Sequence, residues 1–148
     1  LFSPFFNYPL MRFIYKSLIL LFFCHSLIAQ KTFTNPIIPG GYPDPSICRV
    51  GDDFYIVNSS FEYFPGLPIH HSKDLVNWKL IGNGLHRPSQ GSGAVNLVDV
   101  NENGGIHAPT IRYNNGTFYI ITTNMYADPN DRIKSPNTNF IITAKDPA

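Results

Sequence analysis

The sequence predicts an all-β fold made of repeated antiparallel units, as in the blades of a β-propeller. Three observations indicate this class: short runs of β-branched and aromatic residues recur after residue 30, turn-forming residues separate them, and one pattern occurs twice at a spacing of 64 positions. Helical periodicity is hard to find in the same region. The aromatic content of 14% equals the charged content of 14%, which suits short strands joined by turns.

Three runs are predicted to be strands: 54–58 (FYIVN), 118–123 (FYIITT) and 140–143 (FIIT). They are rich in the β-branched and aromatic residues that pack well on a pleated sheet. Turn formers at 51–53 and 114–116 precede the first two runs, where a hairpin has to reverse direction. We therefore expect a meander of antiparallel strands.

The chain also repeats itself. Residues 45–47 and 54–57 align without a gap to 109–111 and 118–121. A second match, Ser-Lys-Asp at 72–74 and Ala-Lys-Asp at 144–146, is 72 positions apart because of an insertion. One propeller blade cannot bury both of its faces, and propellers typically have about four to eight blades. A chain that ends in its second unit cannot close such a ring, so we expect the first two blades of a propeller truncated at the C-terminus. A two-sheet sandwich is the alternative, and the repeat disfavours it.

Residues 11–29 have the three parts of a secretory signal peptide: basic residues, a short apolar run at 17–24 (SLILLFFC), and a polar-to-small end. Residues 1–10 have no role in such a signal and read as upstream sequence translated by mistake. The expected mature part is 30–148. We predict that it is secreted or periplasmic, with no membrane association after the signal is cleaved.

Two weaker interpretations of this segment remain. A retained membrane anchor is disfavoured because the apolar run is well short of the roughly 20 residues that a spanning helix needs. A lipid-attachment site at Cys24 is disfavoured because Leu21, Phe22 and Phe23 precede it, where small residues are wanted.

The charge, cysteine and histidine content indicates which partners, disulfides and cofactors to expect. The net charge of +1 implies neither nucleic acid nor an anionic membrane surface as a partner. Cys48 is the single cysteine from residue 30 onward, so that part cannot form an internal disulfide, and we expect a buried thiol. The histidines after residue 30 show no metal-ligand spacing with carboxylates or cysteines, so neither a metal nor another cofactor is predicted.

Asp44 is the acidic residue that differs from the others. It lies between Pro43 and Pro45, at the start of the first repeated unit. The following proline is expected to confine Asp44 to extended backbone conformations, so that its carboxylate is held in one direction, which suits a general base. The alternative is a turn Asp between prolines. The repeat weighs against it, because the equivalent position of the second unit is Ala108 and the fold therefore does not require an acid there.

Two further segments combine aromatic and polar residues, as sugar pockets do: 60–66 (SFEYFPG), which contains Phe61, and 104–109 (GGIHAP), which contains His107. An aromatic stripe in a strand protein is more often core than a binding platform. Glu62 could be a buried proton donor, but a structural role is favoured. The remaining acids singled out as structural or solvated are Asp52, Asp53, Asp74, Asp128 and Asp131.

Taken together, these motifs closely resemble the start of family 43 glycoside hydrolases, in particular the β-xylosidase branch, over residues 33–148. The segments that carry the resemblance are NP (35–36), YPDPS (42–46), GDDFY (51–55), SSFEYFPG (59–66), HSKDLVNW (71–78) and GGIHAP (104–109). The resemblance implies a five-bladed propeller that hydrolyses xylosides or arabinofuranosides with inversion, using an Asp base, an Asp that tunes the pKa of the acid, and a Glu acid.

The resemblance assigns the base to Asp44 and an aromatic near the sugar of the −1 subsite to Phe61. His107 stands where related xylosidases often have Trp, which leaves the shape of that pocket open. The pKa-tuning Asp and the acid Glu would lie beyond Ala148, so neither Glu62 nor Asp128 takes those roles, and the 148-residue chain alone is expected to be inactive.

The expected substrates are xylo-oligosaccharides or arabinose-substituted xylan. A non-catalytic carbohydrate-binding propeller is the alternative hypothesis for the function. A structural propeller without a sugar site is a third hypothesis. Because Asp44 and His107 occupy equivalent places in neighbouring units, we expect them to lie close together.

Overall fold

The computed structural model describes residues 8–26, 32–90, 97, 100, 102–125 and 137–148. The chain divides into two units, residues 1–34 and residues 35–148, and each is described by itself. The second unit holds all the strands and the candidate site.

The first unit contains one helix, α1 (Tyr8–Ser26), which covers most of the predicted signal segment and begins before Met11. Its sequence is rich in Leu and Phe and contains no Gly or Pro after Pro9, as a continuous helix requires. Among the residues that the structure describes, no helix is both long and apolar enough to cross a membrane. The signal peptide and its boundaries remain predictions.

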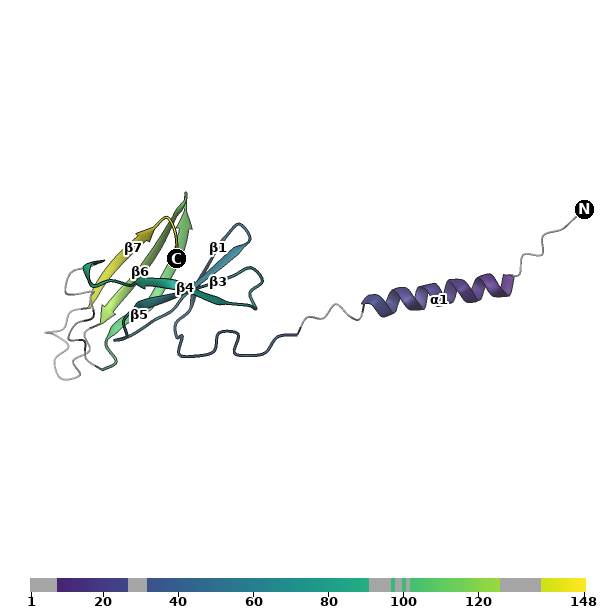
Figure 1. Cartoon of the computed structure of the whole chain (residues 1–148), viewed down its shortest axis with the longest axis horizontal. Coiled ribbons are helices and arrows are strands. Elements are labelled where there is room, and N and C mark those ends of the chain that lie inside the picture. Colours follow the sequence, from purple (N-terminus) through teal and green to yellow (C-terminus); the bar gives the residue numbers. More distant parts are fainter. Residues whose placement is uncertain (1–7, 27–31, 91–96, 98–99, 101, 126–136) are drawn as a thin grey trace, which may run out of the picture. The chain divides into compact units, whose positions relative to one another are not determined.

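The second unit begins with a four-stranded antiparallel sheet in which neighbours in sequence are neighbours in space (Figure 1). Its strands are β1 (Ser46–Val50), β2 (Asp53–Val57), β3 (Gly66–Ser72) and β4 (Lys79–Leu85). A short 3₁₀ helix, η2 (Pro88–Gln90), follows β4. We call this the first sheet.

A three-stranded antiparallel sheet follows, and we call it the second sheet. Its strands are β5 (Gly105–Asn114), β6 (Thr117–Met125) and β7 (Thr138–Ala144). The all-β prediction is thus confirmed in its coarse form of two antiparallel sheets. The three predicted strand runs correspond to β2, β6 and β7.

The sequence repeat is also a structural repeat. Ser46 pairs with Val57 in the first sheet, and Thr110 pairs with Ile121 in the second, so equivalent residues keep the same register. The hairpin turns agree as well, because Gly51 and its equivalent Asn115 both have a positive φ, of 60° and 45°. Gly and Asn are the residues that adopt this conformation at least cost.

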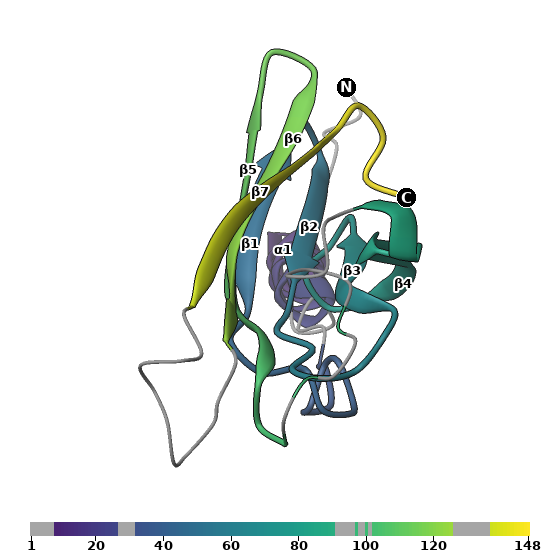
Figure 2. The same ribbon diagram turned by 90° about the vertical axis from the view of Figure 1, so that its left-hand side faces the viewer.

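The apolar core lies between the two sheets, which lie side by side in Figures 1 and 2. The first sheet contributes one half of this core, and the second sheet contributes the other. The buried residues are Val57, Leu67, Ile69, Leu85, Ile106, Ile111, Phe118 and Ile120. Burying each such side chain contributes about 1.5–3 kcal/mol, so the two sheets stabilise each other.

The outer face of the second sheet differs from the equivalent face of the first. Val57 and Ile69, a cross-strand pair on the first sheet, are 0% and 4% exposed because the second sheet covers them. Their repeat equivalents Ile121 and Ile141, also a cross-strand pair, are 54% and 56% exposed. The second sheet therefore presents to solvent the face that the first sheet buries.

Candidate functional site

Asp44 lies at a bulge that precedes β1. The backbone N–H of Ser59 donates to the carbonyl of Pro43 (3.1 Å), and the regular ladder resumes at the Ser46–Val57 pair. Asp44 and Pro45 therefore oppose the single residue Asn58. Two residues opposite one define a β-bulge, a feature that re-aims side chains and is common beside active sites.

The expectation that Asp44 is held in an extended conformation was wrong, because its φ is +51°. The restriction that a following proline imposes is local, and the bulge overrides it. Ala108, which also precedes a proline, has a φ of +44° at the same point of the second sheet, where the β5–β6 register shifts between His107 and Thr110. The left-handed conformation thus belongs to the repeat and not to the acid.

Opposite each bulge, a polar side chain donates a hydrogen bond to a backbone carbonyl just before the bulge. In the first sheet, the amide of Asn58 donates to the carbonyls of Tyr42 (2.7 Å) and Pro43 (3.2 Å). In the second sheet, the hydroxyl of Thr122 donates to the carbonyl of His107 (2.7 Å). Asn58 is 1% exposed and Thr122 is 3% exposed, so water does not compete for these bonds.

The carboxylate of Asp44 is held by one buried hydroxyl. Ser59 Oγ donates to Asp44 Oδ2 (2.6 Å) and accepts a hydrogen bond from the backbone N–H of Ala108 (2.7 Å). Ser59 is 1% exposed, whereas Asp44 is exposed. The structure therefore joins the Asp44 segment to the His107–Ala108 segment through Ser59.

Phe61 and His107 form an aromatic pair next to this bridge. Their ring centroids lie 4.8 Å apart at an angle of 65°, the edge-to-face geometry that aromatic rings favour. The backbone places them together, because Phe61 and Ile106 exchange two hydrogen bonds of 3.0 and 2.9 Å. His107 Nε2 lies 3.2 Å from the carbonyl of Asn103, so this nitrogen carries the hydrogen.

Gly105 is required for this close approach. A Cβ atom there would lie 2.0 Å from the carbonyl oxygen of Phe61, and the φ of Gly105 is +84°. Both facts exclude a side chain, and they explain why a glycine precedes Ile106 in the second unit.

The acids interpreted as structural make local contacts. Asp53 Oδ1 lies 2.6 Å from His71 Nε2 and 3.1 Å from Lys73 Nζ, and hydrogen bonds from both hold the pKa of Asp53 below its usual value. Asp74 closes its own loop, since the backbone N–H and the side-chain amide of Asn77 donate to its carboxylate and hold its pKa well below the usual value. Asp128 and Asp131 lie outside the described residues.

The structure shows neither a reactive thiol nor a cluster of metal ligands among the described residues. Cys48 is half-buried, and burial raises the pKa of its thiol, so it is a poor nucleophile. In the part of the chain that the structure describes, no three His, Cys, Asp or Glu side chains gather as metal ligands.

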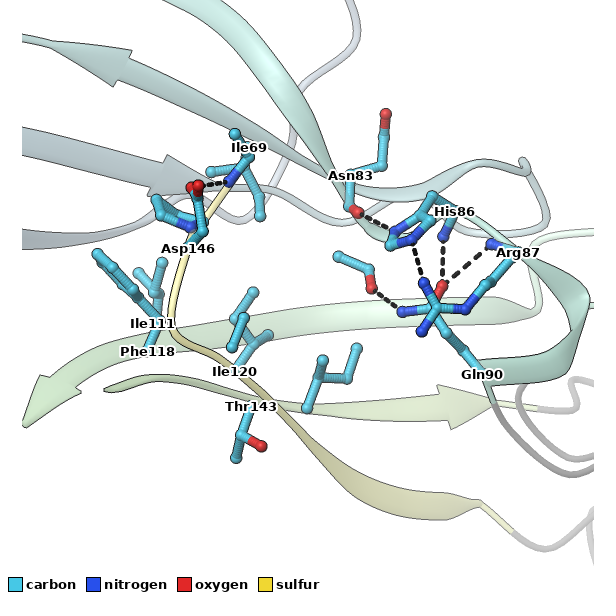
Figure 3. Close-up of a pocket in the computed structure, with 15 residues that line it drawn as sticks. Ile69, Asn83, His86, Arg87, Gln90, Ile111, Phe118, Ile120, Thr143 and Asp146 are labelled. Atoms are coloured by element: carbon cyan, nitrogen blue, oxygen red, sulfur yellow. Dashed lines mark hydrogen bonds between the residues drawn. The ribbon is translucent and has the colours of Figure 1, made fainter. Parts of the chain in front are cut away.

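A cavity of about 220 Å³ opens between the two sheets (Figure 3). Its wall combines apolar core residues such as Ile120 with a polar group at the end of β4, where Gln90 accepts from the N–H groups of His86 and Arg87. Asp44, Phe61 and His107 do not line it. It is therefore a gap between packed sheets and not part of the candidate site.

The sequence singled out Asp44, Phe61 and His107, whose roles stay predictions, and it gave no role to Asn58 or Ser59. The signal was present, since Asn58, Ser59 and Ser60 are three polar residues that directly follow an apolar strand and are all buried. Buried polar side chains need hydrogen-bond partners, so a run of them at a strand end indicates a site that orders the backbone around it.

An anchored, exposed carboxylate near an aromatic pair, on repeated antiparallel sheets, combines the polar and apolar groups that sugar-binding pockets use. The family model for glycosyl hydrolases family 43 matches residues 33–148, and the chain therefore belongs to that family.

Named relatives agree with this assignment. The chain is 57% identical over 122 residues to a non-reducing end alpha-L-arabinofuranosidase of Bacteroides ovatus, an alignment that covers 82% of the chain and 21% of that protein. It is 55% identical over 116 residues to a xylosidase/arabinosidase of Butyrivibrio fibrisolvens, covering 77% of the chain and 19% of that protein. The chain thus spans about a fifth of the length of these curated relatives.

Solved structures are similar as well. A family 43 protein from the xyloglucan locus of Bacteroides ovatus superposes with a TM-score of 0.66 at 56% identity, covering 79% of the chain and 21% of that structure. A xylan beta-1,4-xylosidase of Bacillus halodurans superposes with a TM-score of 0.68 at 42% identity, covering 78% of the chain and 21% of that structure.

Proposed function

We propose that this chain is the N-terminal part of an exo-acting glycosidase that releases xylose or arabinofuranose units from hemicellulose with inversion. The observation that carries the proposal is the anchored carboxylate of Asp44 in a chain that belongs to family 43. The names of the relatives, which include xylosidases and an arabinofuranosidase, support this substrate class. The substrates would be xylo-oligosaccharides or arabinose-substituted xylan.

In this mechanism Asp44 is the general base. Its carboxylate takes a proton from a water molecule, the water oxygen bonds to the anomeric carbon, and the bond from that carbon to the leaving oxygen breaks. A general acid on the opposite side protonates the leaving oxygen, with the two carboxyl groups about 6.5 to 9.5 Å apart so that the water fits between base and sugar. We place this acid Glu, and the Asp that tunes its pKa, outside the present chain.

The aromatic pair is proposed to bound the −1 subsite. Phe61 offers an apolar face against which a sugar ring can pack, and His107 adds a polar edge. Phe61 comes from the loop between β2 and β3, and His107 comes from β5 of the second sheet. The hydrogen bonds of Ser59 connect Asp44 to the second sheet. The pocket therefore depends on the packing of the two sheets.

We further propose that the two sheets are the first two blades of a five-bladed propeller. The exposure of Ile121 and Ile141, whose equivalents Val57 and Ile69 are buried by the next sheet, supports a third blade that packs on the second sheet in the same way. The fraction of the relatives' length that the chain covers is consistent with a ring of several more units. We propose that residues 11–29 direct export, so that the enzyme acts outside the cytoplasm.

The test uses a chimera in which residues 33–148 replace the aligned segment of the Bacteroides ovatus relative; we call it the chimera below. We expect it to hydrolyse an aryl α-L-arabinofuranoside or an aryl β-xyloside, and we expect Asp44→Asn to lower kcat by about 10² to 10⁴. Binding of xylo-oligosaccharides without hydrolysis would instead support a non-catalytic carbohydrate-binding propeller. Neither hydrolysis nor binding would favour a structural role.

A further inference from the structure

We propose that Ser59 is a positioning residue for Asp44, a role that rests on the proposed function. Its hydroxyl fixes the orientation of the Asp44 carboxylate and couples that orientation to the second sheet. The bridge joins two segments that are distant in sequence, because Ser59 contacts Asp44 at 2.6 Å and Ala108 at 2.7 Å.

The direction of the hydrogen bonds follows from the chemistry of a hydroxyl. A serine has one hydrogen to donate and can accept on its oxygen. The backbone N–H of Ala108 can only donate, so it occupies an acceptor position of Ser59 Oγ. The single hydrogen of the hydroxyl is therefore free to point to Asp44 Oδ2. With Ser59 1% exposed, no water competes for either bond.

The two oxygens of the Asp44 carboxylate have different roles in this arrangement. Oδ2 is engaged by Ser59, so the carboxylate cannot rotate without breaking a charge-assisted hydrogen bond. Oδ1 is then the oxygen that we assign to proton transfer from water. A carboxylate that is fixed in the productive orientation removes the proton faster than one that rotates freely.

The repeat separates this role from ordinary strand packing. Thr123 is the equivalent of Ser59 in the second sheet, and its hydroxyl donates to Asn139 Oδ1 (2.6 Å) within the same sheet. The bridge across the sheets therefore occurs in the unit that has the acid. Ser60 is a second buried serine beside it, at 8% exposure, and its hydroxyl accepts from the backbone N–H of Leu67 (3.1 Å).

The experiment compares alanine variants of these two serines in the chimera. We expect Ser59→Ala to lower kcat about 10- to 100-fold, the worth of one hydrogen bond to a charged group, with little change in KM. Ser60→Ala, the matched control, should lower the melting temperature without lowering kcat. Ser59→Thr, which keeps the hydroxyl, should recover a large part of the lost kcat.

A double-mutant cycle distinguishes positioning from a general structural effect. If Ser59 acts through Asp44, then Ser59→Ala should lower the residual rate of the Asp44→Asn chimera far less than it lowers the rate of the unmutated chimera. Should Ser59→Ala fail to fold, Ser59→Cys provides a nearly isosteric weak donor, for which we expect a smaller loss of kcat.

The outcomes separate the two proposals. An active chimera in which Ser59→Ala leaves kcat unchanged, or lowers it equally in both backgrounds, overturns the positioning role and leaves the proposed function standing. An inactive chimera with a native-like melting transition contradicts the proposed function itself.

Discussion

Asp44 and Ala108 occupy the same bulge position in the two sheets, and both have a left-handed backbone, with φ of 51° and 44°. The bulge is therefore a feature of the repeat, and the carboxylate is an addition to it in the first unit. Non-glycine residues in this conformation carry a conformational cost of about 1–3 kcal/mol each, which functional sites tolerate because the surrounding contacts hold the residue in place.

The first prediction concerns stability. Asn tolerates the left-handed region at least as well as Asp and keeps an oxygen that can accept from Ser59. We therefore expect Asp44→Asn to change the free energy of unfolding of the chimera by less than about 1 kcal/mol. Denaturant unfolding measures this. A loss of several kcal/mol would mean that Asp44 is a structural residue of the bulge.

The second prediction concerns Gly105. Its missing Cβ would lie 2.0 Å from a backbone oxygen of Phe61, so Gly105→Ala should destabilise the chimera by about 3 kcal/mol or more. Gly116 is the control: its φ is +74°, but nothing lies within 4 Å of a Cβ there. Gly116→Ala should cost about 1–2 kcal/mol, from the backbone conformation alone. Equal losses for the two variants would contradict the close approach of Gly105 to Phe61.

The third prediction concerns the outer face of the second sheet. Residues 33–148 expressed alone should self-associate, because Ile121 and Ile141 form an exposed apolar pair on a sheet. Replacing both by Ser should reduce this self-association in gel filtration. In the chimera, where a third blade is proposed to cover the pair, the same change should lower stability by roughly 2–4 kcal/mol. Similar small effects in both proteins would contradict the proposed third blade.

How much of this could be read from the sequence differs between elements. β2, β6 and β7 were predicted because each is a compact run of β-branched and aromatic residues, whereas β4 (Lys79–Leu85) was missed because its two glycines and an asparagine weaken the strand pattern. The sequence repeat aligned the two units correctly, because equivalent residues, such as Ser46 and Thr110, pair at equivalent positions of the two sheets.

The candidate site was predicted in part. Phe61 and His107 were selected for their chemistry, and the structure brings their rings together, although their roles remain proposals. The conformation of Asp44 was predicted wrongly, because the local effect of Pro45 gave no sign of the bulge. Ser59 was missed because its two partners lie 15 and 49 residues away in sequence. Contacts of that kind depend on how the sheets pack.

The fourth prediction concerns residues 30–148 expressed alone. Inversion needs an acid as well as a base, and we place the acid outside this chain. The purified fragment should therefore hydrolyse neither aryl xyloside nor aryl arabinofuranoside. Turnover that Asp44→Asn abolishes would show that a complete site lies within the fragment, and the proposed division of the site would have to be withdrawn.

The most direct test of Asp44 as the base of an inverting enzyme is NMR observation of the first anomer that the chimera releases from an aryl glycoside, with and without Asp44→Asn. We predict that the unmutated chimera releases sugar of inverted configuration and that Asp44→Asn reduces the rate about 10² to 10⁴-fold. Release of sugar with retained configuration, or an unchanged rate in the Asp44→Asn chimera, would contradict the assignment of Asp44 as the base.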